Sequence, residues 1–498
     1  MRLPETGGAA LARRMHERGA RMTNKTKQMS PVDSAWLHME EPTNLMMITG
    51  VSLLDELPDF ERFRKTLEVR LLTLDRFTMR VVEPMLPVGT PHWEVDPNFD
   101  LDAHVHRVAL PAPGDMRELQ RFISDLASTP LDFSKPLWNI HLVENVAGGA
   151  AMVLRLHHCI GDGTAMNAVL FRLMDMARDA PIGEVQEPAA EELKRRDFVS
   201  TVFRPVGSIG KALRQLAHEG SESLRHPSRI AQGAGAAAEA AGIVGRVLLM
   251  TPDPETPFKG PLGVQKRVAW SNNVALADVK TVTKALGAKV NDVMLSAVAG
   301  GLRDYLLARN AEVDDLEIRA VIPVDLRPPQ RGIELGNAFG LVFLALPLSI
   351  ADPVERLRET KKRMDAIKQS IEAVTFFSLL SLFGVTPRKV EEQGLSIFGS
   401  RATAVVTNVR GPGQALYIAG SKIENIMGWV PQAGHLGLGV SIFSYDGKVS
   451  VGVITDAGLV PDPEQITARF RERFDELLAI ANEAEANEVA PNALNPAG

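Results

Sequence analysis

The stretch AMVLRLHHCIGDGTAMNAVL, residues 151–170, contains the patterns that decide the surrounding architecture. AMVLRL is an apolar run of the length of a buried strand, and behind the HHCIGDG segment apolar residues such as Ala165 and Val169 recur at helical spacing. Gly161 and Gly163 allow a tight turn between the two. We therefore predict a strand, a turn and a helix, as in a layered α/β domain, with two histidines, a cysteine and an aspartate in the turn.

Length and composition favour a globular protein of two domains. The 498 residues exceed the size of one ordinary hydrophobic core, and 45% apolar and 23% charged residues are typical of globular chains. The net charge of −6 comes without a basic stripe, which argues against a nucleic-acid partner. Apolar runs such as LVFLALPLSI, residues 341–350, are shorter than the roughly 20 residues that span a bilayer, so we predict no transmembrane helix.

Two features indicate a cytoplasmic location. The single cysteine excludes an intramolecular disulfide and fits a reducing compartment. The first 28 residues carry seven Arg or Lys against two Glu, and they lack the apolar core of a secretory signal. We expect this segment to be a disordered basic tail.

The remaining patterns predict a second α/β lobe and its limits. Strands are expected at residues 319–326, 339–348 and 402–409, and a hairpin at 439–455 with Asp446 and Gly447 in its turn. Helices are expected after Ser30 and at residues 353–373 and 463–481. The resulting division is a disordered tail at 1–28, an N-terminal lobe at 29–180, a helical connector at 181–258, a C-terminal lobe at 259–485 and a disordered tail at 486–498.

Metal and nucleophile chemistry fit the histidine cluster poorly. Neighbouring strand residues point to opposite faces, so His157 and His158 cannot easily bind one ion, and we predict no metal site. The chain has no G-x-S-x-G elbow, and strand geometry turns Cys159 away from His158. Cys159 is therefore interpreted as a small buried apolar residue.

General base catalysis suits the spacing better. A histidine near its ordinary pKa can take a proton from a hydroxyl while that oxygen attacks an acyl carbon. His158 ends the strand, and Asp162 lies four residues on, where it can fix the loop or hold the imidazole tautomer. The alternative is that both histidines are satisfied core residues.

HHCIGDG resembles the HHxxxDG signature of the acyl-CoA-dependent acyltransferase superfamily, which includes chloramphenicol acetyltransferase and peptide-synthetase condensation domains. Further segments resemble the bifunctional wax ester synthase/diacylglycerol acyltransferase family, and the resemblance covers about residues 30–481. These segments are SPVDSAWLHME, PLDFSKPLWNIHLVE, GPLGVQKRVAW, KVNDVMLSAVAGGLR, PVDLRP, GNAFG and TNVRGPGQALYIAG.

The resemblance implies two lobes of the chloramphenicol acetyltransferase type, each a mixed sheet flanked by helices, with a tunnel between them. His158 would be the general base at its centre, Asp162 mainly structural and His157 a supporting residue, while Gly163 closes the motif at the substrate site.

Other family positions carry alternatives. Pro136, Leu137 and Trp138 match the family's PLW motif and would line a substrate channel, or they open a strand with a core tryptophan. Asn291 and Asp292 match its ND motif. The Asn291 amide could stabilise an oxyanion, or it could serve as an ordinary helix cap.

The implied reaction is direct transfer of a long-chain acyl group from acyl-CoA to a fatty alcohol or diacylglycerol, with no bound cofactor and no metal. Because such substrates partition into lipid, we expect peripheral attachment to a membrane or lipid-droplet surface. Two alternatives are an acyltransferase that uses a carrier-bound thioester and a lipid-binding relative without turnover.

Overall fold

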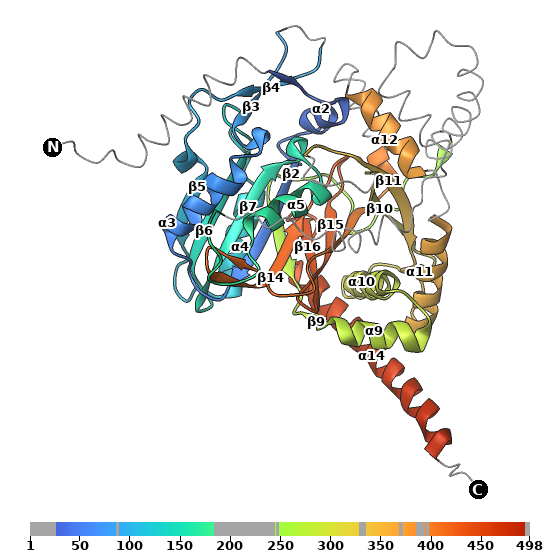
Figure 1. Ribbon diagram of the computed structural model, residues 1–498. Coiled ribbons are helices and arrows are strands. Elements are labelled where there is room, and N and C mark those ends of the chain that lie inside the picture. The colour runs from blue at the N-terminus through green and yellow to red at the C-terminus, as the bar shows by residue number, and fades with distance from the viewer. Residues whose placement is uncertain are drawn as a thin grey trace, which may run out of the picture.

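The computed structural model describes most of the chain and shows two mixed sheets with flanking helices (Figure 1). The described residues are 26–85, 89–183, 245, 249–327, 335–367, 372–384, 394 and 398–493. Most of the predicted connector at 181–258 and residues 1–25 of the predicted basic tail lie outside the described residues.

Six strands form the first sheet, and its centre is the predicted apolar strand. They are β2 (Met47–Leu54), β5 (Val105–Ala109), β6 (Trp138–Val146), β7 (Gly149–His157), β13 (Tyr417–Ile418) and β14 (Ser421–Trp429). Their order is β13-β14-β2-β7-β6-β5, with only the β5–β6 pair parallel. Every residue of β7 after Gly149 is buried, which explains its uninterrupted apolar run.

Helices of the first half are short and lie around this sheet. They are α2 (Pro31–His38), α3 (Phe60–Thr66), α4 (Met116–Ala127) and α5 (Gly163–Leu173), and a π-helical stretch, Leu67–Leu71, extends α3. A separate three-stranded sheet consists of β1 (Lys27–Gln28), β3 (Met79–Val82) and β4 (His92–Val95). Lys27 and Gln28 are therefore ordered in a strand, which corrects the predicted tail at 1–28 for these two residues.

The second sheet belongs to the C-terminal half. Its strands are β8 (Lys266–Trp270), β9 (Val274–Ala275), β10 (Ile318–Asp325), β11 (Phe339–Leu346), β12 (Ala404–Arg410), β15 (Leu438–Tyr445) and β16 (Lys448–Asp456). The order is β11-β10-β12-β15-β16-β8, with β9 also paired to β16. Strands β10, β12 and β15 are parallel to one another.

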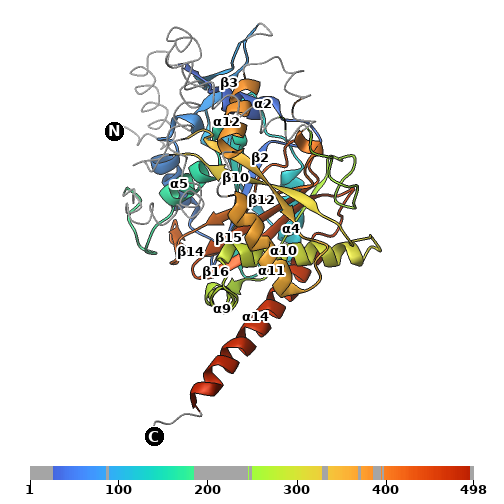
Figure 2. The same ribbon diagram turned by 90° about the vertical axis from the view of Figure 1, so that its right-hand side faces the viewer.

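One layer of helices covers this second sheet. It consists of α9 (Leu276–Leu286), α10 (Val290–Leu307), α11 (Pro353–Ile367) and α14 (Glu464–Ala493), and α10 packs against the other three. Figure 2 shows α14 extending beyond the body of the molecule. Another helix, α12 (Glu372–Phe383), packs instead against β11 and α2. It forms a bridge between the two halves of the chain.

A strand of the C-terminal half completes the N-terminal sheet. β14 pairs antiparallel with β2, so that Met427 lies opposite Val51. The predicted division at residue 259 therefore does not hold for residues 417–429, because the free edge of β2 needs a hydrogen-bonding partner. The fold class predicted from the resemblance, two mixed sheets flanked by helices, is confirmed.

Several predicted elements are present with small shifts. Ser30 caps α2 by accepting a hydrogen bond from Asp33 N at 3.1 Å, and the β15–β16 hairpin turns at Asp446 and Gly447 with φ of 48° and 70°. The helix predicted at 353–373 ends at Ile367, and residue 372 already begins α12. Residues 486–493 belong to α14, so the predicted disordered tail is wrong for that part.

No helix within the described ranges combines the length and the apolar character needed to cross a bilayer.

Candidate active site

The HHCIGDG segment forms the predicted turn between β7 and α5. β7 ends at His157, a single 3-10 turn covers His158–Ile160, and α5 begins at Gly163. The Asp162 carboxylate accepts a hydrogen bond from Ala165 N at 3.0 Å and caps α5. The strand, turn and helix are thus confirmed, but the prediction that His158 ends the strand is wrong by one residue, because His158 begins the turn.

Asp162 fixes this turn to the C-terminal half. Its two carboxylate oxygens lie 2.8 and 2.7 Å from Nη1 of Arg327, and Oδ2 accepts a hydrogen bond from Ala338 N at 2.9 Å. Arg327 also donates to the carbonyl of Gly336, whose own N–H donates to Ile160 O at 3.0 Å. Of the two roles considered for Asp162, these contacts fit the fixing of the loop.

A second polar group holds the backbone of the turn. Asn337 Nδ2 donates to His158 O at 2.8 Å and to Asp33 Oδ1 at 2.7 Å. Arg76 donates to Asp33 Oδ2 and to Cys159 O, both at 2.9 Å. The turn is therefore held from both halves of the chain by buried or half-buried charges, an arrangement that favours one geometry for this loop.

The His158 imidazole lies among aromatic rings of α2 and β11. It stacks on Trp36 with ring centroids 4.0 Å apart and planes at 20°, and the Phe339 ring lies 5.6 Å away. The residue is 3% exposed. Burial lowers the pKa of His158 from 6.5 to about 4, although the charge of Asp162 and the Asn337 side chain act in the opposite direction. At neutral pH the ring is uncharged and can accept a proton.

His157 points away from this ring and has its own partners. Its Nδ1 accepts a hydrogen bond from Cys159 N at 3.1 Å, which places the ring proton on Nε2. Nε2 lies 3.0 Å from a carboxylate oxygen of Glu40, an electrostatic contact without the angle of a hydrogen bond. Glu40 in turn accepts from Met46 N. His157 thus ties the end of β7 to the segment before β2.

Cys159 is unsuited to nucleophilic attack. The side chain is buried, and burial raises the pKa of its thiol well above the ordinary value, with the Asp33 charge adding to the effect. The thiolate is the nucleophilic form, so the thiol is inert here. Among the described residues, no group of three or more His, Cys, Asp or Glu side chains is arranged to bind a metal ion.

An apolar cavity, called the sheet cavity, lies on one side of the turn. Its walls come from β2, β7 and α5 of one half and β12, β14 and β15 of the other, and they include Leu156, Met166, Val409 and Phe443. Its empty volume is about 610 Å³. Gly163 also lines it, and a Cβ there would meet no atom within 4 Å. The motif glycine leaves this side of the turn open.

A second apolar cavity, called the α12 cavity, lies on the Trp36 side. It is enclosed by α2, α12, β11 and neighbouring strands, and its empty volume is about 700 Å³. Its lining includes Leu341, Phe343, Phe376 and Val405. The sheet cavity reaches the turn at Gly163, and the α12 cavity reaches Trp36, which stacks on His158. Two apolar spaces therefore flank the turn that carries His158.

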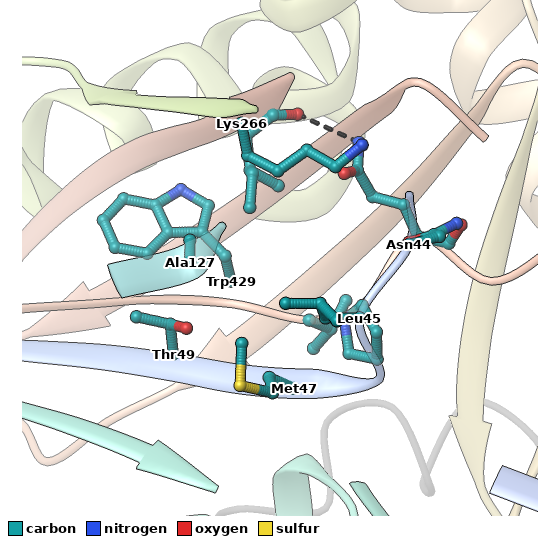
Figure 3. A pocket seen from close by; sticks show the side chains of 11 residues that line it. Asn44, Leu45, Met47, Thr49, Ala127, Lys266 and Trp429 are labelled. Carbon is teal, nitrogen blue, oxygen red and sulfur yellow. Dashed lines mark hydrogen bonds between the residues drawn. The ribbon is translucent and has the colours of Figure 1, made fainter. Parts of the chain in front are cut away.

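A smaller and more polar cavity lies between the two halves (Figure 3). Met47 and Thr49 line it from β2, and Lys266 lines it from β8. The Lys266 ammonium forms an ion pair with the buried Asp456 carboxylate at 2.8 Å. Residues 429–431 connect the three spaces: Trp429 and Val430 line this cavity and the sheet cavity, and Pro431 lines this cavity and the α12 cavity.

The PLW residues lie in the core of the first half. Leu137 O accepts a hydrogen bond from His157 N at 2.9 Å, so the segment contacts the backbone of the motif. Trp138 opens β6, donates to Phe77 O at 2.9 Å and stacks on His104 with centroids 4.6 Å apart. Pro136, like the other two, is buried and lines neither apolar cavity. This geometry fits the core alternative.

Asn291 and Asp292 lie at the start of α10. The Asp292 carboxylate accepts a hydrogen bond from Lys289 N at 2.9 Å, and Asn291 Oδ1 accepts one from the Asn408 amide. On β12, residues 407 and 409 line the sheet cavity, so residue 408 points to the opposite, α10-facing side. The contacts observed are those of a helix start, and the oxyanion role of Asn291 stays a prediction.

Five residues around His158 were not predicted from the sequence. Asp33 and Trp36 lie three residues apart on α2, and the others come from three further segments. The sequence does carry a signal for Asp33, Arg76 and Arg327, because each is a charged residue close to apolar residues. Such a residue, when buried, needs a partner of opposite charge or a hydrogen-bonding group. The five are Asp33, Trp36, Arg76, Arg327 and Phe339.

Comparisons with known proteins agree with this geometry. Residues 29–294 match the wax ester synthase/diacylglycerol acyltransferase catalytic domain, and residues 335–478 match the C-terminal domain of the same family. A Mycobacterium tuberculosis protein named "Putative diacyglycerol O-acyltransferase" is 31% identical over 485 residues, 95% of each chain. Another from that organism, named "Probable diacyglycerol O-acyltransferase", is 27% identical over 431 residues, 85% of this chain and 89% of that one.

Solved structures show the same fold. The wax ester synthase/diacylglycerol acyltransferase of Marinobacter aquaeolei VT8 superposes with a TM-score of 0.66 at 21% identity, covering 92% of this chain and 100% of that one. The first condensation domain of a calcium-dependent antibiotic synthetase gives 0.57 at 16% identity, covering 92% and 97%. With both family domains matched in order along the chain, this protein belongs to the wax ester synthase/diacylglycerol acyltransferase family and is an acyltransferase.

Proposed function

We propose that this acyltransferase moves a long-chain acyl group from acyl-CoA to the hydroxyl of diacylglycerol or a fatty alcohol, with His158 as the general base. The observation that carries the proposal is the position of the His158 imidazole on a fixed turn at the end of β7, where the sheet cavity reaches Gly163 and the α12 cavity reaches Trp36, on which the ring stacks. The names of the relatives as diacylglycerol O-acyltransferases favour diacylglycerol as one acceptor.

The proposed reaction proceeds in one transfer. The imidazole takes the hydroxyl proton as the acceptor oxygen attacks the thioester carbon. The new C–O bond forms, the C–S bond breaks, and the imidazolium gives its proton to the departing CoA sulfur. The products are an ester and CoA thiol, so the reaction balances without an acyl-enzyme, metal or bound cofactor. Asp162, Arg327 and Asn337 act as positioning residues, because each contacts the backbone or cap of the turn.

The test is release of CoA thiol by the purified full chain with palmitoyl-CoA and either dipalmitoylglycerol or hexadecanol, together with detection of the ester. We expect His158→Ala to lose about 10²–10⁴-fold in kcat, the usual contribution of a general base. His92→Ala on β4 is the matched control, because this histidine lies in the separate three-stranded sheet. Wild-type turnover by His158→Ala would remove the assignment.

The same assay separates the two alternatives. A carrier-dependent enzyme would use a carrier-bound acyl thioester and leave palmitoyl-CoA untouched. A lipid-binding relative would release no thiol from any pair of substrates. Either outcome contradicts the proposal.

We also propose that the protein acts in the cytoplasm at a membrane or lipid-droplet surface. The support is chemical: long-chain acceptors reside in lipid, and an enzyme with apolar cavities must collect them there. Flotation with phosphatidylglycerol-containing vesicles should carry the full chain to the lipid layer. Complete recovery of the protein in the lipid-free fraction would count against attachment.

A further inference from the structure

The α12 cavity begins beside the catalytic ring. Trp36 lines the cavity and also stacks on His158 with centroids 4.0 Å apart. Phe339, 5.6 Å from His158, starts the β11 row that continues with Leu341 and Phe343, because alternate strand residues share one face. Both of these later residues line the cavity. An elongated apolar floor thus runs outward from His158.

The far end of this floor is formed by a row across the sheet. Phe343 lies opposite Val321 on β10, and Val321 lies beside Val405 on β12. All three line the cavity. From Phe339 to Phe343 the strand advances four residues, about 13 Å at the usual rise. The Phe343 ring also packs against Phe376, with centroids 5.5 Å apart, so aromatic side chains close this end.

The roof of the cavity is held at both ends. A Cβ on Gly340 would lie 1.7 Å from Ala373 O, so the first turn of α12 rests directly on the β11 backbone. A Cβ on Gly384 would lie 1.6 Å from Pro31 O, so the other end of α12 rests on α2. These contacts fix the helix above the α12 cavity, which is lined mainly by apolar side chains. The space is therefore part of the packing arrangement.

We propose that the α12 cavity binds the long hydrocarbon chain of one of the two substrates. The row formed by Phe343, Val321 and Val405 at its far end then sets the longest chain that fits. This inference rests on the proposed function, since it assigns a place to a substrate of that reaction. The chemistry is an apolar alkyl chain, because the named walls are aliphatic and aromatic. The chain could belong to the acyl thioester or to the acceptor, and the experiment separates these two sources.

The test enlarges and shortens one side chain, that of Val405. Val405→Phe shortens the floor and Val405→Ala lengthens it, while Val264→Phe makes the same change at a valine that is 52% exposed. One arm measures kcat/KM for octanoyl- to stearoyl-CoA with one alcohol. The other arm measures octanol to octadecanol with one acyl-CoA. Each methylene transferred from water contributes roughly fourfold in affinity, so losing the space for two methylenes changes the long-to-short ratio by about tenfold or more.

We expect Val405→Phe to lower the long-to-short ratio about tenfold in one arm, Val405→Ala to raise it in the same arm, and Val264→Phe to leave both arms unchanged. A shift in the thioester arm assigns the cavity to the acyl chain, and a shift in the alcohol arm assigns it to the acceptor. If both Val405 variants turn over with wild-type length profiles in both arms, the proposal is overturned.

A binding measurement keeps this result separate from the proposed reaction. Dibromostearic acid quenches tryptophan fluorescence at short range, and Trp36 forms a wall of the cavity. We expect the acid to quench the tryptophan fluorescence of the His158→Ala protein. When Val405→Phe is added, half-maximal quenching should need an at least about tenfold higher concentration of the acid. If the His158→Ala protein shows no quenching, or quenching that Trp36→Phe leaves unchanged, the α12 cavity is not the chain site, whatever the activity assay shows.

Discussion

Replacement of Asp162 tests whether the motif aspartate acts as a clamp between the two halves of the chain. Asp162→Asn keeps the size of the side chain and can still cap α5, because asparagine is also a good N-cap residue. It removes the negative charge that faces the Arg327 side chain, which is 11% exposed. Breaking a buried ion pair in this way costs roughly 3–5 kcal/mol. Arg327 keeps its bond to Gly336 O, so we expect the lower end, about 3 kcal/mol.

Asp162→Ala should cost more, because asparagine keeps one of the two acceptor oxygens and alanine keeps neither. The cap on Ala165 N is worth about 1 kcal/mol. The N–H of Ala338, which donates to the other carboxylate oxygen, loses its acceptor in both variants, at about 1–3 kcal/mol. The Ala variant should therefore be less stable than the Asn variant by about 1 kcal/mol.

Urea unfolding followed by fluorescence and circular dichroism measures both differences, provided that the two probes give one transition. In a double-mutant cycle, the stability lost by Arg327→Met should be smaller when Asp162→Asn is already present. The coupling energy between the two positions should exceed about 1 kcal/mol. Both variants should lower kcat, because the turn that carries His158 loses its anchor. Stability of Asp162→Asn within about 0.5 kcal/mol of wild type, together with zero coupling, would refute the clamp.

Three further outcomes follow from the same site. Burial puts the folded pKa of His158 at about 4, below the unfolded value of 6.5, so the unfolded chain binds the proton first as pH falls. Protonation should therefore lower the free energy of unfolding by up to about 3 kcal/mol between pH 6.5 and pH 4, while kcat/KM loses its base only near pH 4. Unfolding of the wild type and of His158→Ala across that pH range measures the difference. Gly161→Ala should lower the free energy of unfolding by about 1–3 kcal/mol, because its Cβ would lie 2.9 Å from that of Ala165. A Cβ at Gly163 would meet no atom within 4 Å, so Gly163→Ala should stay within about 0.5 kcal/mol of the wild type. Thermal unfolding measures both. Iodoacetamide should label Cys159 only in urea, and rapid labelling of the native protein would contradict its burial.

The sequence was informative wherever a local pattern determines structure. The apolar run before His157, the helical spacing after Gly163 and the Asp446-Gly447 turn all depend on neighbours within a few residues, and each predicted element is present. Family resemblance added the two-lobed architecture. The helix predicted at 353–373 shows the limit of periodicity, because it does not separate α11 from α12, whose different packing partners lie elsewhere in the chain.

Long-range contacts were the part that could not be predicted. The stacking of Trp36 on His158 and the pairing of Asp162 with Arg327 join residues more than one hundred positions apart. Spacing along the chain carries no information on such pairs. The same holds for the pKa of His158, because its largest cause is burial, while His157 and Asp162 have smaller effects.

The late strand β14 has a consequence for how the protein can be made and divided. A fragment ending near residue 294 would contain the whole HHxxxDG turn, yet β2 would expose an unsatisfied row of backbone groups where Met427 and its neighbours belong. Open edges of this kind recruit other chains, so such a fragment should aggregate instead of working alone. Pairing β2 with a partner almost four hundred residues away also delays closure of the catalytic sheet until synthesis is nearly finished. The first sheet can therefore be completed only after Trp429 has been synthesised, when more than four fifths of the 498-residue polypeptide exists.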